Sequence, residues 1–251
     1  MDTISFDYYD HSFCEASLYP TGSPEYINSI TSLYISYIGL FGLLYNSKKN
    51  DDITMAYASL VVNGICSAMY HYTNVIGWGL MDRFSMIMIV VYSYNFFLSS
   101  LSSGTLTRIG IITYLTLLTT VTGLHYETGF NILFGCFLVS LMFLLFIQDR
   151  TIGFTNEQWN FGICGIKYII LSGTFWILTE MLCTSFWFMK FTFGHAWWHI
   201  GVSTGGYYLT LTQNTDFYST IRYKYGLPYW KIDHAHINSL KLQGQNNQVG
   251  V

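Results

Sequence analysis

The hydrophobic positions of this chain gather into seven long runs, and short polar segments separate each run from the next. A helix that crosses a membrane needs about 20 mostly apolar residues, which is close to the length of each run. The pattern therefore predicts an all-α, polytopic membrane protein with seven transmembrane helices. The spans are expected at residues 26–46, 54–72, 82–101, 108–124, 130–148, 161–182 and 188–212.

The least distinct boundary lies between the sixth and seventh runs, where Glu180 and Lys190 flank the break. Six or eight spans are the alternatives, but seven agrees best with the polar separators. This count divides the chain into an N-terminal segment at 1–25, a transmembrane domain at 26–212 and a C-terminal tail at 213–251.

Basic residues are unevenly distributed between the two sides that seven spans define. Only Arg83 and Lys190 fall on the side of the N-terminus, and Lys167 lies within a span. Because cytosolic loops carry an excess of lysine and arginine, we expect a luminal or exterior N-terminal segment and a cytosolic tail. The remaining basic residues share the side of the C-terminus and are Lys48, Lys49, Arg108, Arg150, Arg222, Lys224, Lys231 and Lys241.

Composition supports lipid as the solvent of most of the chain. Of the 251 residues, 51% are hydrophobic and only 10% are charged, whereas a soluble domain carries about 25% charged residues. The net charge of −3 offers no basic surface for nucleic acid. The first residues, MDTISFDYYD, lack the regions of a cleavable signal peptide, so the first span is expected to direct membrane insertion.

Several chemically reactive side chains fall inside the predicted spans, where ionisable groups are costly and are typically functional. His71 ends the second span, with Ser67 one helical turn before it, and Asp82 begins the third. His195 and His199 share one face of the seventh span, in its first half. Because alternate spans run in opposite directions, all five residues are expected in the luminal half of the bundle.

Three histidines at one depth are typical of a catalytic zinc site, in which the fourth ligand position stays open for water. Asp82 could take a proton from that water and pass it to a leaving nitrogen. Ser67 could donate a hydrogen bond to the developing oxyanion. We expect no other acid beside the histidines, since Glu25 and Glu180 should lie nearer the membrane surface. A single histidine would more often be a packing residue, but the HxxxH pair with a third histidine favours a metal.

These motifs resemble the alkaline ceramidase family, part of a superfamily of seven-helix membrane hydrolases that also contains the adiponectin-type receptors. The superfamily pattern is a serine and a histidine on the second helix, an aspartate on the third and HxxxH on the seventh. The string HAWWHI is more specific, and it is similar to ceramidases rather than to receptors or GPI-remodelling lipases. The matching positions are Ser67, His71, Asp82, His195 and His199.

The resemblance implies a zinc-dependent amidase that cleaves the N-acyl bond of ceramide-type sphingolipids to a sphingoid base and a fatty acid. Ceramide would reach the site laterally from the bilayer, and the implied location is the endoplasmic reticulum or the Golgi. Two alternatives stay open. One is another lipid hydrolase of the superfamily, and the other is a receptor-like protein in which zinc is structural.

The resemblance further implies a calcium site in the N-terminal segment. SFCEAS at 12–17 and EYINS at 25–29 resemble the calcium-binding motifs of the family. Ser12 and Ser17 stand where the family has an aspartate and an asparagine, and calcium takes six to eight oxygen ligands. Asp7 or Asp10 could supply the missing carboxylate. The implied calcium ligands are Phe13, Glu15, Ser17 and Glu25.

A disulfide is the last feature that the resemblance implies. Cys14 and Cys183 match, in motif position, cysteines that the family pairs. The predicted topology also puts both on the oxidising side of the membrane, where a disulfide persists. The alternative is a pair of unrelated buried thiols.

Overall fold

The computed structural model describes residues 13–20, 23–45, 51–99, 105–125 and 127–212, which all belong to one compact unit, Met1–Phe217. This part of the chain is all-α, as the hydrophobic pattern predicts. Two short 3-10 helices, η1 (Cys14–Leu18) and η2 (Trp187–Phe191), precede the first and last long helices. The predicted tail at 213–251 lies outside the described residues. The seven long helices are α1 (Tyr26–Tyr45), α2 (Asp51–Thr73), α3 (Ile76–Ser99), α4 (Thr105–His125), α5 (Glu127–Ile152), α6 (Asn156–Leu182) and α7 (Gly194–Leu211).

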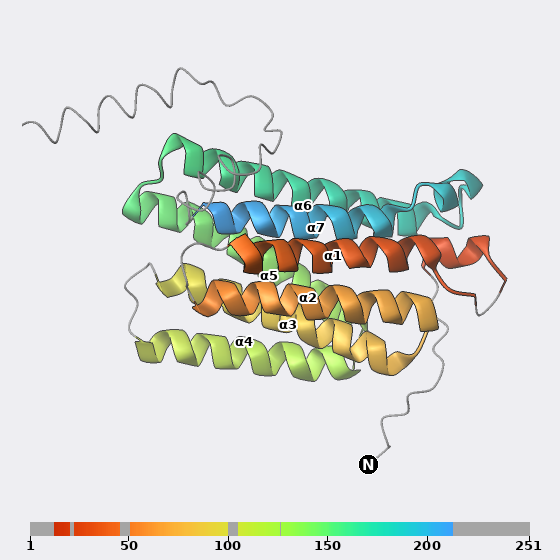
Figure 1. Ribbon diagram of the computed structural model, residues 1–251, viewed down its shortest axis with the longest axis horizontal. Coiled ribbons are helices and arrows are strands. Elements are labelled where there is room, and N and C mark those ends of the chain that lie inside the picture. The colour runs from red at the N-terminus through yellow and green to blue at the C-terminus, as the bar shows by residue number, and fades with distance from the viewer. Residues whose placement is uncertain (1–12, 21–22, 46–50, 100–104, 126, 213–251) are drawn as a thin grey trace, which may run out of the picture. The chain divides into compact units, whose positions relative to one another are not determined.

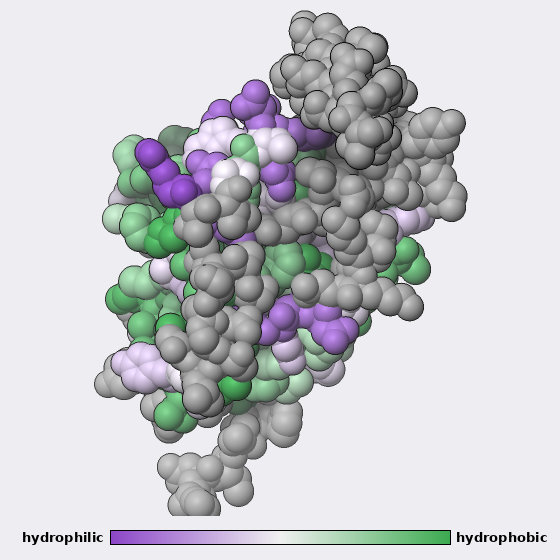
Figure 2. Space-filling model, turned by 90° about the vertical axis from the view of Figure 1, so that its left-hand side faces the viewer, coloured by the Kyte–Doolittle hydropathy of each residue, from purple (hydrophilic) through white to green (hydrophobic). Residues whose placement is uncertain are grey.

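Five of these helices, α1, α2, α3, α5 and α6, are long and apolar enough to cross a membrane. In α4 the apolar stretch Ile109–Thr120 is shorter, and α7 carries two histidines and several glycines among its apolar residues. Large apolar side chains such as Leu44 and Leu171 are exposed on the outside of the helices. In Figure 2, hydrophobic residues cover the flanks of the bundle, and hydrophilic residues gather on the end that faces the viewer. The chain is therefore a polytopic membrane protein.

The helices are arranged so that α7 lies between α6 and α1 (Figure 1), while α1, α2 and α3 pack as successive neighbours. Glycines allow the closest of these approaches. A Cβ on Gly165 would lie 2.8 Å from the carbonyl oxygen of Gly205, and one on Gly205 would lie 2.7 Å from that of Gly165. Such small residues let the backbones of membrane helices meet. The contact fixes α7 against α6 and holds its histidines inside the bundle.

Most helix boundaries differ from the hydropathy prediction by a few residues, and the starts of the third and last helices differ most. The last helix begins at Gly194 rather than 188, because Trp187–Phe191 form η2 and Phe193 adopts a left-handed backbone conformation (φ 50°, ψ 46°). Trp187, Phe188 and Phe191 of η2 are hydrophobic but exposed, so hydropathy alone could not separate this segment from a span. The third helix begins at Ile76 rather than 82, which places Asp82 in its second turn instead of at its mouth.

Candidate metal centre

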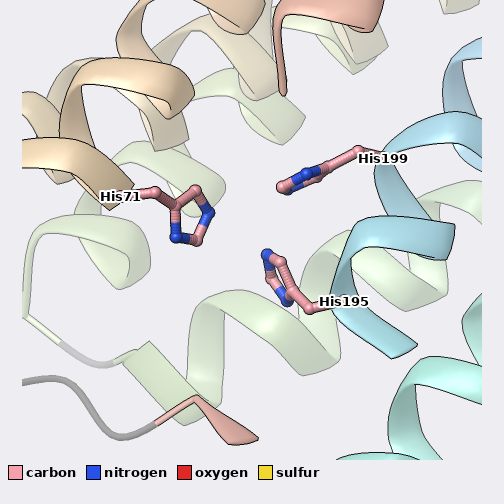
Figure 3. A group of neighbouring side chains, drawn as sticks. All are labelled: His71, His195 and His199. Atoms are coloured by element: carbon pink, nitrogen blue, oxygen red, sulfur yellow. The ribbon is translucent and has the colours of Figure 1, made fainter. Parts of the chain in front are cut away.

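Three histidines from two helices meet inside the bundle. His71 comes from the last turn of α2, and His195 and His199 come from the first two turns of α7. The ring centroids of His195 and His199 lie 4.6 Å apart, and they lie 5.0 and 5.3 Å from that of His71 (Figure 3). One nitrogen of each ring lies within 4.8 Å of the others, and all three residues are buried. This buried cluster could hold a metal ion.

A buried carboxylate orients His71. Glu25, the residue before α1, has its Oε2 atom 2.6 Å from the Nδ1 of His71, and the Asn28 side chain donates to the same oxygen at 3.0 Å. Glu25 and His71 are almost wholly buried. When Glu25 is ionised its carboxylate only accepts hydrogen bonds, so that Nδ1 carries the ring hydrogen and Nε2 keeps its lone pair. A carboxylate in this position is a common partner of metal-binding histidines.

Two hydroxyls of α1 orient His199 in the same way. Its Nδ1 lies 3.1 Å from the Oγ1 of Thr31 and 3.3 Å from the Oγ of Ser32. Each hydroxyl has a shorter bond to a backbone carbonyl of its own helix, Thr31 to Ile27 and Ser32 to Asn28, both at 2.8 Å. Since a hydroxyl has one hydrogen, both favour accepting from Nδ1. His199, like His71, then presents Nε2 toward the centre of the cluster.

Ser67 and Asp82 line the same cavity as the histidines. Ser67 lies one turn before His71, and its Oγ lies 3.0 Å from the Oγ of Ser32. Asp82 reaches the cavity from α3. The side chain of Asn63, on α2, donates to its Oδ1 at 2.7 Å. The structure therefore gathers all five residues that the motifs single out around one cavity.

The expectation that no acid but Asp82 stands beside the histidines is wrong, since Glu25 contacts His71 directly. Glu25 precedes the first span, on the side of the membrane where His71 ends the second. The parity of the spans could therefore have placed it at this depth. The roles of Thr31 and Ser32 were also missed, because hydroxyls within an apolar run give no sequence signal of their own.

The four residues of the implied calcium site all have partners within the protein, and the carbonyl of Phe13 accepts the backbone N–H of Ala16 at 2.9 Å. The two carboxylate oxygens of Glu15 accept the backbone N–H groups of Ile27 and Asn28 at 2.7 and 2.8 Å, which caps the start of α1. Burial raises the pKa of Glu15, and these two bonds partly offset the rise. The Ser17 hydroxyl donates to the carbonyl of Cys14, and Glu25 is the partner of His71. A calcium ion here stays a prediction, and Ser12, Asp7 and Asp10 lie outside the described residues.

A disulfide between Cys14 and Cys183, with a Cα–Cα distance of 5.7 Å, ties η1 to the end of α6. The backbone N–H of Cys14 also donates to Glu180 Oε2 at 2.8 Å. Next to this link, the ring of Phe13 packs against that of His195, with 4.2 Å between centroids. Phe13 and the start of η1 are thus fastened over the histidines from one side.

The cavity beneath the histidines is largely apolar and is lined from α1, α2, α3, α5, α6 and α7. Its polar groups include Asn63, Ser67, Asp82 and the histidines, whereas side chains such as Val90, Leu138 and Leu209 line it elsewhere. An apolar cavity with a few convergent polar groups is typical of a site for a small hydrophobic molecule.

Comparison with known proteins yields one match that covers most of the chain. A family model described as Ceramidase matches residues 10–239. No curated protein matches the chain. The matched range contains the three histidines, Ser67 and Asp82.

Proposed function

The chain belongs to the ceramidase family, and we propose on this premise that it is a zinc-dependent membrane amidase that hydrolyses the N-acyl bond of ceramide. The products would be a sphingoid base and a fatty acid. The observation that carries this proposal is the buried histidine cluster at one end of an apolar cavity that also contains an acid and a serine.

Zinc fits the donor set of the site. His71, His195 and His199 would hold it through ring nitrogens, and three protein ligands are the usual number in a catalytic zinc site. The hydrogen bonds of His71 to Glu25 and of His199 to Thr31 and Ser32 leave Nε2 of both rings available. When bound, zinc would activate water and polarise the amide carbonyl.

Asp82 and Ser67 would divide the remaining work. Asp82 would accept the proton of the attacking water and deliver it to the departing nitrogen, while Asn63 holds its carboxylate in place. Ser67 would donate its hydroxyl to the amide oxygen as charge develops there. The Oγ of Ser32 lies 3.0 Å from that of Ser67 and holds the Ser67 hydroxyl beside the histidines.

The substrate class follows from the surroundings of the site. Apolar walls at membrane depth suit a molecule with long hydrocarbon chains that arrives laterally from the bilayer. The Cys14–Cys183 disulfide supports an oxidising environment at the histidine end. We therefore place this end in the lumen of the endoplasmic reticulum or the Golgi, and the C-terminal tail in the cytosol.

Removing the negative charge beside His71 should weaken metal binding. Glu25→Gln keeps the size of the side chain but lowers the basicity that the carboxylate confers on the ring, and such changes reduce metal affinity by about 10–100-fold. The affinity would be measured on purified protein by zinc competition with a chelator in calcium-free buffer. Glu157→Gln, in the first turn of α6, is the matched control and should leave affinity unchanged. Equal affinities for the two variants would show that the contact is not part of a metal site.

Direct metal analysis and lipid analysis test the proposal as a whole. Purified wild-type protein should contain one zinc per chain, and His195→Ala should contain less, because one of three ligands is gone. Cells that produce the wild type should accumulate free sphingoid bases relative to cells that produce His195→Ala. Full zinc occupancy in the variant, or the same sphingoid bases in both cell lines, contradicts the proposal.

A further inference from the structure

We propose that Tyr57 and Thr210 close the deep end of the cavity and set the longest acyl chain that the protein accepts. This inference rests on the proposed function, since it assigns the cavity below the histidines to the fatty acyl chain of the substrate. It adds a determinant of chain length that lies far from the metal ligands along both α2 and α7.

The two residues lie at the end of the cavity away from the histidines, where Ala56 also lines it. Ten residues separate Ser67 from Tyr57 on α2, and eleven separate His199 from Thr210 on α7. We call Tyr57 and Thr210 the floor of the cavity. At a helical rise of 1.5 Å per residue, the floor lies about 15–17 Å from Ser67 and His199. Half of a hydrocarbon core of about 30 Å has a similar depth. The cavity can therefore take a chain of the length found in one leaflet.

The floor is held in place from two sides. Tyr57 is buried, and its hydroxyl lies 2.5 Å from that of Thr210, which joins α2 to α7 across the cavity. On the side of α1, a Cβ added to Gly42 would come within 2.2–2.5 Å of three atoms of the Tyr57 ring. The ring therefore lies directly against the backbone of α1 and has no room to move toward it.

The acyl chain fits this space better than the sphingoid base does. An acyl chain is pure hydrocarbon from the first carbon beyond the carbonyl, whereas a sphingoid base carries hydroxyls next to the amide nitrogen. Toward the floor the cavity is lined by Leu60, Val202 and Leu209. The two polar residues nearest the site, Asn63 and Ser203, are already hydrogen-bonded to Asp82 and to the carbonyl of His199. With the carbonyl at the histidines, the acyl chain would run along this lining and leave no hydroxyl of its own unpaired there.

Shortening the side chain of Tyr57 should increase the acyl-chain length that the protein prefers. Tyr57→Ala opens the floor toward the next turn of α2, about 5.4 Å further on, which is room for roughly four methylene groups. Each extra methylene that becomes buried should then favour binding by about fourfold. Tyr57→Phe is the matched control, because it loses the hydroxyl but keeps the ring, and it should retain the wild-type limit.

A second variant should move the limit in the opposite direction. Gly206 lines the cavity above the floor, and a Cβ added there would meet nothing within 4 Å. The first carbon of a new side chain therefore has room, and Gly206→Leu should add bulk to the cavity and exclude the longest chains that the wild type accepts. This variant keeps the inference testable if Tyr57→Ala fails to fold.

The experiment measures hydrolysis of ceramides with N-acyl chains of graded length by the purified wild type and the three variants. Binding of free fatty acids of the same lengths, followed by thermal stabilisation, provides a readout independent of turnover. We expect the length limit to rise in Tyr57→Ala, to fall in Gly206→Leu and to stay constant in Tyr57→Phe. Unchanged limits in both Tyr57→Ala and Gly206→Leu would overturn the inference, as would a shift seen only when the sphingoid base is varied. A wild type that hydrolyses no ceramide would instead refute the proposed function.

Discussion

Asp82→Asn is expected to lose about 10²–10⁴-fold in ceramide turnover while keeping its zinc and its fold. Amide hydrolysis needs one proton removed from the attacking water and another delivered to the departing nitrogen. Zinc supplies neither transfer, and Glu25, the other acid at the site, is already bonded to His71 and Asn28. Asparagine can still meet the Asn63 amide through its own carbonyl, so the change removes the proton carrier and little else.

Turnover and zinc content would be measured on the same preparations of this variant. Asp51→Asn is the matched control, since it makes the same change at the exposed start of α2, the end far from His71. It should hydrolyse ceramide at the wild-type rate. If Asp82→Asn also does so, the assignment of proton transfer to Asp82 is wrong, whatever metal the histidines bind.

Ser67→Ala is expected to lower turnover by about 10²–10³-fold, the effect of removing one oxyanion donor. The loss should appear in kcat, because the hydroxyl contributes most when negative charge forms on the amide oxygen. Zinc content should remain that of the wild type, since Ser67 lies beside the cluster and is not among its three histidines.

A control for this variant is available on the same helix. Ser59 is also buried, but its hydroxyl donates to the carbonyl of Met55 within α2. Ser59→Ala therefore makes the same chemical change two turns away from Ser67, and its turnover should match that of the wild type. Equal losses in Ser59→Ala and Ser67→Ala would mean that α2 is merely destabilised and that Ser67 donates nothing to the reaction.

Much of the fold was predictable because hydropathy and span parity depend only on the order of residues. Seven predicted spans of alternating direction were enough to bring His71, now on α2, level with His195 and His199, now on α7. Boundaries were less predictable where side chains are hydrophobic without being helical, as at Trp187–Phe191. There the chain forms an exposed 3-10 turn, so α7 begins only at Gly194.

The partners of the histidines were not predictable, because they depend on which helices are neighbours. Parity fixes the depth of a residue but not the position of its helix around the bundle. Thr31 and Ser32 contact His199 only because α7 lies between α6 and α1, with that face of α1 turned toward it (Figure 1). The resemblance implied that Glu25 is a calcium ligand. In the structure its carboxylate forms a hydrogen bond with His71.

The most direct test is hydrolysis of ceramide by the purified full-length protein, before and after removal of its zinc. We expect the wild type to release sphingoid base and fatty acid in equal amounts. A chelator should abolish this activity, and added zinc should restore it. Purified protein that holds one zinc per chain and releases no sphingoid base would contradict the central claim and would favour a receptor-like protein with a structural metal.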